Sequence, residues 1–227
     1  MSRAERAPTA DLLGSLSPVE AKNAPETIEY RGDPSLLVKG VRVAVVGTRK
    51  PSELGVMRTE RLVRYLAENA FTVVSGLAAG VDTVAHRRCM DFHGRTVAVL
   101  GSPLDHPYPK ENAGLLEEIA RSHLAISEFP SGSPILPTNF PRRNRTMALL
   151  SHATVIVEAG ASSGTEHQGW EALRLGRELF LLESLLKGPA SWPHEMIEYG
   201  AVILASPEQI VERLPSPAHV SEAESPF

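Results

Sequence analysis

The chain has 227 residues, a formal net charge of −4, 42% hydrophobic residues and 22% charged residues. This size and composition are ordinary for a globular protein, and they exclude collagen-like, coiled-coil and wholly disordered chains. An acidic chain with only 5% aromatic residues is a poor candidate for coating duplex DNA with its whole surface or for stacking a long row of bases. This composition still allows a local basic binding site.

The cysteine content and the hydropathy pattern bear on the compartment. Cys89 is the only cysteine, so neither an internal disulfide nor a multi-cysteine zinc site can form. No apolar run reaches the roughly 18 residues of a membrane helix, and no signal-peptide core follows Met1. We expect a cytoplasmic protein that does not enter a membrane.

The chain divides into three parts by composition. Residues 1–40 carry scattered charge without a sustained period, and we expect a partly ordered N-terminal arm. Residues 41–214 form the body, which we expect to be one domain. Residues 215–227 hold three prolines and two glutamates without Lys or Arg, which is typical of a disordered acidic tail.

The body alternates short apolar runs with helical patterns. Strands are expected at 43–46, 72–74, 96–100, 124–126, 154–157, 178–182 and 201–204. Helices are expected near 56–69, 79–92, 111–121, 143–151, 165–176 and 206–213. This alternation predicts an α/β fold with a doubly wound, mainly parallel sheet covered by helices in a three-layer sandwich. Ligands of such sheets bind outside the carboxyl ends of the strands, so the segments after each strand matter most.

The segment after the first expected strand is suited to an anion. It reads Gly47, Thr48, Arg49, Lys50. A glycine lets backbone N–H groups approach a phosphate in front of a helix, and the two cations favour that reading. The segment lacks the full GxGxxG pattern, so a tight turn between strand and helix is an equal alternative.

The second expected strand is followed by a loop of small residues. Ser75, Gly76 and Gly80 could cradle a phosphate. Asp82 and His86 follow at a spacing of four, which puts them on one helix face. A hydrogen bond on the helix surface explains that pair better than a metal site or a catalytic triad does.

Two later loops offer further contacts. Tyr108 lies in a proline-rich loop and either stacks on a base or packs against the body. Ser163 and Gly164 open a helix and suit phosphate or ribose. Glu158 ends a buried strand and Glu166 follows it in the helix, so both are candidates for a polar ligand contact or, for Glu158, an ion pair.

The strongest electrostatic feature is a cluster of arginines at an expected helix start. Arg142, Arg143 and Arg145 lie where the helix dipole disfavours cations, and a bound phosphate would explain them. Pairing with Glu128 or Glu158 is the alternative.

The sequence shows no arrangement of nucleophile, base and orienting group. The HExxH, GxSxG and Walker patterns are absent. We therefore expect a non-enzymatic site for a phosphate-rich ligand, without a metal or other cofactor.

Taken together, these segments resemble the DNA-processing protein A family (DprA, also called Smf). The matching segments, in order and spacing, are VAVVGTR at 43–49, SGLAAGVD at 75–82, VAVLGSPLD at 97–105, SEFP at 127–130 and FPRRNR at 140–145. Each motif alone is weak, but the ordered set over about 41–182 is specific.

The resemblance implies an extended Rossmann-like domain that binds single-stranded DNA in a basic pocket. It also implies delivery of the strand to the RecA recombinase during natural transformation, and a homodimer. The residues that it places in the pocket are Gly47, Arg49, Ser75, Gly76, Arg142, Arg143, Asn144 and Arg145.

Two segments depart from the family pattern, 165–169 and 183–188. They leave open a site for a small nucleotide in place of a DNA strand. One form of this alternative is a phosphoribohydrolase of the related LOG type, with Glu166 or Glu171 as the catalytic carboxylate. The other is a domain that senses a nucleotide-derived ligand.

Overall fold

The computed structural model describes residues 4–160 and 164–215. Its strands are β1 (Glu5–Pro8), β2 (Thr27–Gly32), β3 (Arg42–Val46), β4 (Thr72–Ser75), β5 (Arg95–Leu100), β6 (Leu124–Ser127), β7 (Ala153–Ile156), β8 (Glu178–Leu182) and β9 (Val202–Leu204). They form one sheet in the order β1-β2-β6-β5-β4-β3-β7-β8-β9. All neighbours from β6 to β9 pair in parallel, which confirms the predicted doubly wound sheet.

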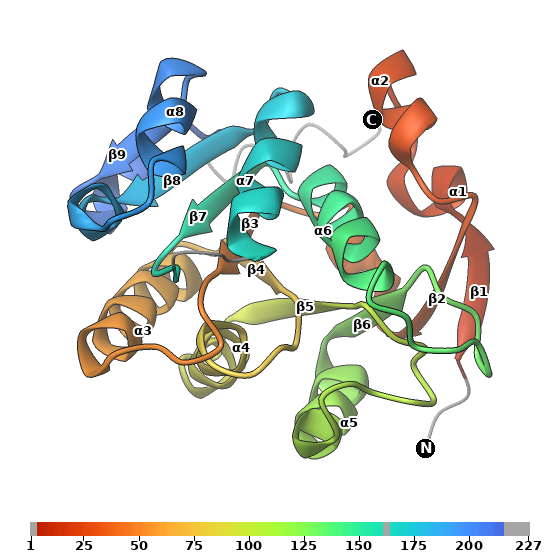
Figure 1. Ribbon diagram of the computed structural model, residues 1–227. Helices are drawn as coiled ribbons and strands as arrows, with labels where there is room; N and C mark the ends of the chain where they lie inside the picture. Colours follow the sequence, from red (N-terminus) through yellow and green to blue (C-terminus); the bar gives the residue numbers. More distant parts are fainter. Residues whose placement is uncertain (1–3, 161–163, 216–227) are drawn as a thin grey trace, which may run out of the picture.

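Helices cover both faces of this sheet. They are α1 (Thr9–Leu13), α2 (Pro18–Asn23), α3 (Glu53–Glu68), α4 (Val81–Asp91), α5 (Ala113–Ser122), α6 (Asn139–Leu150), α7 (Gly164–Arg174) and α8 (Trp192–Glu198). Short 3₁₀ turns are η1 (Pro34–Leu37), η2 (Lys110–Asn112), η3 (Glu183–Lys187) and η4 (Pro207–Ile210). Figure 1 shows α3, α4 and α5 on one face and α6 and α7 on the other, as in a three-layer sandwich. Within the described residues, no helix is long and apolar enough to cross a membrane.

The N-terminal region differs from the arm expected at 1–40. From residue 4 onward it contributes β1 and β2, which extend the sheet as antiparallel strands beyond β6. Ile28 of β2 is fully buried, and the Arg31 guanidinium forms a two-pronged ion pair with Glu117 of α5 at 2.7 and 2.6 Å. Most residues of these two strands are polar, and only β1 is an edge strand, since β2 pairs with both β1 and β6. The sequence analysis missed them because they lack the apolar runs of the central strands. The tail expected at 215–227 lies, apart from Pro215, outside the described residues.

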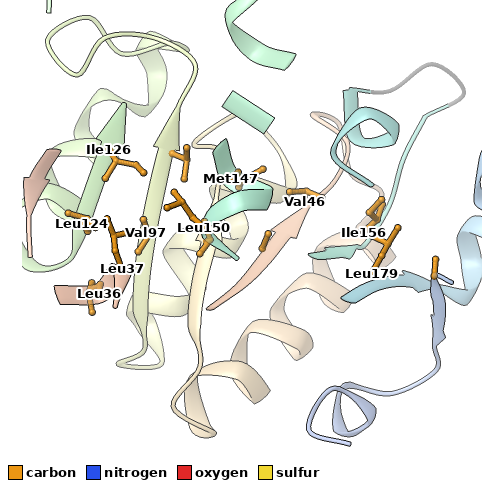
Figure 2. Packing of buried hydrophobic residues seen from close by; sticks show 14 of the residues in the cluster. Leu36, Leu37, Val46, Val97, Leu124, Ile126, Met147, Leu150, Ile156 and Leu179 are labelled. Atoms are coloured by element: carbon orange, nitrogen blue, oxygen red, sulfur yellow. The ribbon is translucent and has the colours of Figure 1, made fainter. Parts of the chain in front are cut away.

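Helix α6 is fixed to the sheet by its apolar face. Met147 and Leu150, three residues apart, point at the strands and pack near Val97 of β5 and Val46 of β3 (Figure 2). Residues three apart share one side of a helix, so this face buries both side chains. The helix begins over the carboxyl ends of the central strands, and its first turns therefore bear on any ligand bound there.

Candidate nucleic-acid interface

The chain changes direction in the sheet between β3 and β7. Strands β4, β5 and β6 follow β3 on one side, and β7, β8 and β9 extend the other side. Adjacent connections diverge at such a point and leave a crevice at the carboxyl ends of the strands. A pocket of about 490 Å³ lies here. It is lined by Val46, Gly47, Thr48, Arg49, Lys50, Ala78, Asp82, Phe140, Arg143, Asn144, Met147, Gly160, Gly164, Thr165 and Gln168.

The loop after β3 forms one wall of the pocket and is held from both sides. The Thr48 backbone N–H donates to the Glu158 carbonyl at 2.7 Å, and the Val81 N–H donates to the Thr48 carbonyl at 3.1 Å. A Cβ on Gly47 would lie 2.6 Å from Val81 Cγ2, so only glycine fits between the two neighbouring elements. The loop fixes the backbone while leaving the Arg49 and Lys50 side chains exposed.

Arg143 reaches the same pocket from α6, but it is buried. Its guanidinium donates to the Val99 carbonyl at 2.9 Å and to the Gly76 carbonyl, and its Nε donates to Asn144 Oδ1 at 3.1 Å. Burial lowers the pKa of Arg143, and attraction to the buried Asp82 opposes that shift. The side chain therefore joins α6 to the ends of β4 and β5 and adds a positive charge to the floor of the pocket.

Asp82 is the negative group of this site. Its Oδ2 accepts the backbone N–H groups of Gly76 at 3.2 Å and Ala78 at 3.3 Å. Burial raises the pKa of the Asp82 carboxyl, against the attraction of Arg143. The sequence analysis expected Asp82 and His86 to form a hydrogen bond on the helix surface, but the structure shows a different arrangement. His86 is buried, its Nδ1 lies 2.7 Å from Thr96 Oγ1, and burial lowers its pKa to about 3.

Ser75 and Gly76, which the sequence analysis placed in the pocket, lie beneath it instead. The Ser75 hydroxyl donates to the Val45 carbonyl at 2.7 Å and is fully buried. A Cβ on Gly76 would overlap the Arg143 guanidinium and lie 2.7 Å from Asp82 Oδ2. The glycine thus makes room for a protein side chain, and neither residue is among those that line the pocket.

Gly80 also has a structural role. It precedes α4 with a φ of 82°, a conformation that side chains with a Cβ rarely adopt. A Cβ there would also lie 2.6 Å from the carbonyl carbon of Arg49. Gly80 therefore lets α4 begin against the loop after β3, and it does not itself line the pocket.

The arginine cluster of α6 separates, because successive residues of a helix point about 100° apart. Only Arg143 lines the pocket. Arg142 pairs with Glu128 at 2.8 Å, as the alternative interpretation had allowed, and Arg145 pairs with Glu171 at 3.4 Å. Neither Arg142 nor Arg145 is among the lining residues. Their expected place in the pocket is therefore not what the structure has, since each faces a carboxylate on a neighbouring element.

The remaining sequence candidates have different positions. Glu158 accepts the Ser52 backbone N–H at 3.1 Å and the Ser52 hydroxyl at 2.9 Å, which ties it to the start of α3. Among the described residues Glu158 forms no ion pair with arginine. Glu166 lies in the first turn of α7 and does not line the pocket, whereas Gly164 does. Ser163 lies outside the described residues.

Aromatic side chains continue from the pocket to the surface. The Phe140 ring lines the pocket, with the Arg49 guanidinium 5.8 Å from its centre. The ring of Tyr108 lies 5.6 Å from that of Phe140 at an angle of 56°, and Tyr108 is 45% exposed. A cation beside two accessible rings is suited to a phosphate followed by a stacked base. Phe140 belongs to the FPRRNR motif, but its residue type alone did not distinguish it from a core side chain.

The sequence analysis also missed Gln168 of α7. It is 1% exposed, and its Nε2 donates to Thr154 Oγ1 at 3.3 Å. Its Oε1 is buried without a hydrogen-bond partner among the described residues. Nothing in the local sequence separates this glutamine from an exposed helix residue, because only the packing of α7 on β7 buries it.

The comparison with known families matches nearly the whole chain. The model of the family "DNA recombination-mediator protein A" matches residues 14–215. DNA processing protein DprA of Bacillus subtilis is 34% identical over 84% of this chain and 65% of its own length. Protein Smf of Escherichia coli is 38% identical over 83% of this chain and 52% of its own length. The chain thus spans about half to two thirds of these relatives.

Solved structures agree with this assignment. The X-ray structure of DprA from Streptococcus pneumoniae superposes with a TM-score of 0.81 at 33% identity, covering 93% of this chain and 75% of that one. DprA from Helicobacter pylori, a structure that addresses its single-stranded DNA binding mode, gives 0.77 at 29% identity, covering 92% and 94%. The chain belongs to the DNA recombination-mediator protein A family, that of the DprA and Smf proteins.

Proposed function

We propose that this protein binds single-stranded DNA in the pocket between β3 and β7 and acts in DNA processing during transformation and recombination. One observation carries the proposal. The pocket has the exposed cations Arg49 and Lys50 on its rim and Arg143 on its floor. The single carboxylate among its described lining residues, Asp82, is buried under backbone N–H groups.

The arrangement supports a mode of binding that does not depend on base sequence. Arg49 and Lys50 meet phosphates, while Phe140 and Tyr108 offer ring faces to the adjoining bases. Base–aromatic stacking is tolerant of sequence, because every base has a π-face. Phosphate contacts make the affinity fall as salt rises, with a slope of about 0.7 per contact on a single strand.

The phosphoribohydrolase alternative needs a carboxylate facing the ligand. Glu171 is 5% exposed, and both Arg145 and Arg174 pair with it. Neither Glu166 nor Glu171 is among the described lining residues of the pocket. A pocket of about 490 Å³ has room for a nucleotide, so a nucleotide competitor belongs in the test.

The test is fluorescence anisotropy of a labelled oligothymidine at low and moderate salt, with AMP as competitor. We expect salt-sensitive binding of the strand that AMP at millimolar concentration does not displace. Absence of strand binding, together with a rise in melting temperature on adding AMP, would contradict the proposal and favour a nucleotide site.

We propose further that the protein acts as a homodimer and passes the bound strand to RecA, as the family resemblance implies. Light scattering after size-exclusion chromatography tests the first point, with twice the chain mass of 24.6 kDa as the expected result. For the second, the protein is expected to shorten the lag of RecA assembly on a strand coated with single-strand-binding protein. A monomer, or an unchanged lag, would contradict the respective point.

A further inference from the structure

The basic pocket is one of three adjoining pockets along the same edge of the sheet. A second pocket, of about 240 Å³, shares Gly160 with the first and is lined by segments that follow β7 and β8. A third, of about 320 Å³, shares Arg58 and Ser184 with the second and lies at the ends of β8 and β9. We call the three together the trough. Parallel strands end at one edge of a sheet, so the trough follows the carboxyl ends from β3 to β9.

The far end of the trough carries a second group of cations. Arg58 and Arg61 of α3 and Lys187 of η3 line the third pocket, together with the carboxylate of Glu183. Arg58 Nη1 donates to Ser184 Oγ at 3.1 Å, which orients the guanidinium across the second and third pockets. Lys187 pairs with Glu183 at 2.8 Å, but both side chains are mostly exposed, and such pairs exchange partners at little cost.

The middle pocket has both polar and apolar walls, with Arg58 and the Glu158 carboxylate among its polar lining residues. Its walls include Leu185, Pro189, Pro193 and Trp192, which are apolar. Trp192 is 4% exposed, and its indole Nε1 is a buried donor without a hydrogen-bond partner among the described residues. The nitrogen is covered by the protein, so Trp192 contributes apolar surface to the pocket wall. A pocket of about 240 Å³ is smaller than typical sites for drug-sized molecules and has room for one flat ring.

We propose that the trough is the path of the DNA strand and that Arg58, Arg61 and Lys187 form a second phosphate subsite. This rests on the proposed function, whose pocket is the first subsite. A nucleobase occupies the middle pocket, against its apolar residues Leu185, Pro189 and Pro193. Cations at both ends of the trough, with a partly apolar pocket between them, match the alternation of phosphate and base along a strand. The ends of β3 and β9 lie three strand spacings apart, about 14 Å, so one nucleotide cannot reach both subsites.

The length dependence of binding tests this path. Oligothymidines from about 3 to about 20 nucleotides are titrated against wild type and an Arg58→Ala, Arg61→Ala double variant. We expect the double variant to bind the shortest strands within about twofold of wild type and the longest about tenfold more weakly, with a salt slope lower by about 1.4 for two lost contacts. The control is Arg64→Ala, also on α3, whose guanidinium stacks on Phe92 at 4.6 Å, outside the trough. This variant should bind oligothymidines of every length with the affinity of wild type.

Further variants guard against a loss of folding. Lys187→Ala changes a side chain that is 72% exposed and should weaken only long strands, by about threefold. Melting curves check that each variant folds. If Arg49→Ala weakens every length while the Arg58 and Arg61 variant weakens none, the second subsite is wrong and the first pocket stands. If wild type binds no strand of any length, both proposals fail.

Discussion

The cations of α6 and those of the loop after β3 look alike in the sequence and differ in the structure. On α6, Arg142 pairs with Glu128, Arg145 pairs with Glu171, and Arg143 is buried against backbone carbonyls. In the loop, Arg49 and Lys50 are exposed and have no ion pair within the described part of the chain. The denser cluster thus serves mainly the fold, and the two loop cations are available to a ligand.

This difference follows from where each segment lies. Helix α6 packs on the sheet beside α7, so its arginines meet Glu128 after β6, Glu171 of α7 and the carbonyl groups of Gly76 and Val99. The loop after β3 is held at Thr48 through its backbone, and Arg49 and Lys50 line the crevice between the diverging connections. A cation contributes to ligand binding when its protein partners do not already satisfy it. Variants in the two regions should therefore separate stability from DNA affinity.

The largest expected effect is on stability, at Arg143. Replacing Arg143 with Ala leaves the buried Asp82 without its opposite charge and removes the donors to two carbonyls. Loss of one partner from a buried charged network costs about 3 to 5 kcal/mol of unfolding free energy. Urea unfolding followed by circular dichroism measures it. A loss below about 1 kcal/mol would mean that Arg143 does not hold the sheet to α6.

The same buried region makes stability depend on pH through His86. Burial, with Arg143 nearby, lowers the pKa of His86 to about 3, whereas an unfolded histidine titrates near 6.5. Above 6.5 the imidazole is neutral in both states. As pH falls from 6.5 toward 3, only the unfolded chain binds the proton, so stability is lost, by about 2 kcal/mol at pH 5. His152, with a pKa lowered to about 4, acts in the same direction.

Unfolding in urea at about pH 7.5 and about pH 5 checks this dependence. Because the raised pKa of Asp82 acts in the opposite direction, wild type is compared with His86→Gln, which cannot take up the proton. The variant should lose less stability than wild type between the two pH values. Equal losses would show that His86 titrates normally in the folded protein.

A smaller effect, on affinity alone, is expected at Arg49. Arg49→Ala removes an exposed guanidinium from the pocket rim and should weaken binding of oligothymidine about tenfold, which is about 1.4 kcal/mol. The slope of affinity against salt should fall by about 0.7. Unfolding free energy should stay within about 0.5 kcal/mol of wild type. Lost stability with unchanged affinity would reverse the assigned roles of the two regions.

The smallest effects belong to the outer arginines of α6. The side chains of Arg142 and Arg145 are 58% and 42% exposed, whereas their partners Glu128 and Glu171 are each 6% exposed. Each carboxylate keeps a second partner, the Thr146 hydroxyl or Arg174, so loss of the half-exposed arginine costs only about 0 to 1 kcal/mol. Arg142→Ala and Arg145→Ala should therefore change stability by less than about 1 kcal/mol and strand affinity by less than about twofold. Calorimetric melting and anisotropy measure both. A tenfold weaker affinity in either variant would return these arginines to the binding site.

The central fold could be predicted from the sequence because its strands are short, apolar and β-branched. Strand β8 was expected at 178–182 and spans Glu178–Leu182, β3 to β6 differ from expectation by one residue at one end, and β7 is shifted by one residue. Strand β1 carries two charged residues in the four-residue stretch ERAP and could not be recognised. Its place depends on pairing with β2, a contact between residues about 20 apart in the chain.

Some of the residues expected at the candidate site line a pocket at the strand ends, and others do not. The rule for parallel sheets placed it at the strand ends, and Gly47, Thr48, Arg49, Lys50 and Gly164 line the pocket. Sequence reasoning could not tell Arg143 from Arg142, because only the direction of each side chain on the packed helix decides which one meets the sheet. Gly76 was expected to contact phosphate because it has no Cβ. In the structure, the same lack of a Cβ leaves room for the Arg143 guanidinium.

The most direct test compares Arg49→Ala with Arg142→Ala in one titration of labelled oligothymidine at two salt concentrations. The two substitutions remove the same charge about 93 positions apart in the chain, one from the pocket rim and one from an ion pair with Glu128. We expect Arg49→Ala to lose about tenfold in affinity and part of the salt slope, and Arg142→Ala to match wild type. Equal losses in both variants, or a loss in Arg142→Ala alone, would contradict the assignment of the binding site to the pocket between β3 and β7.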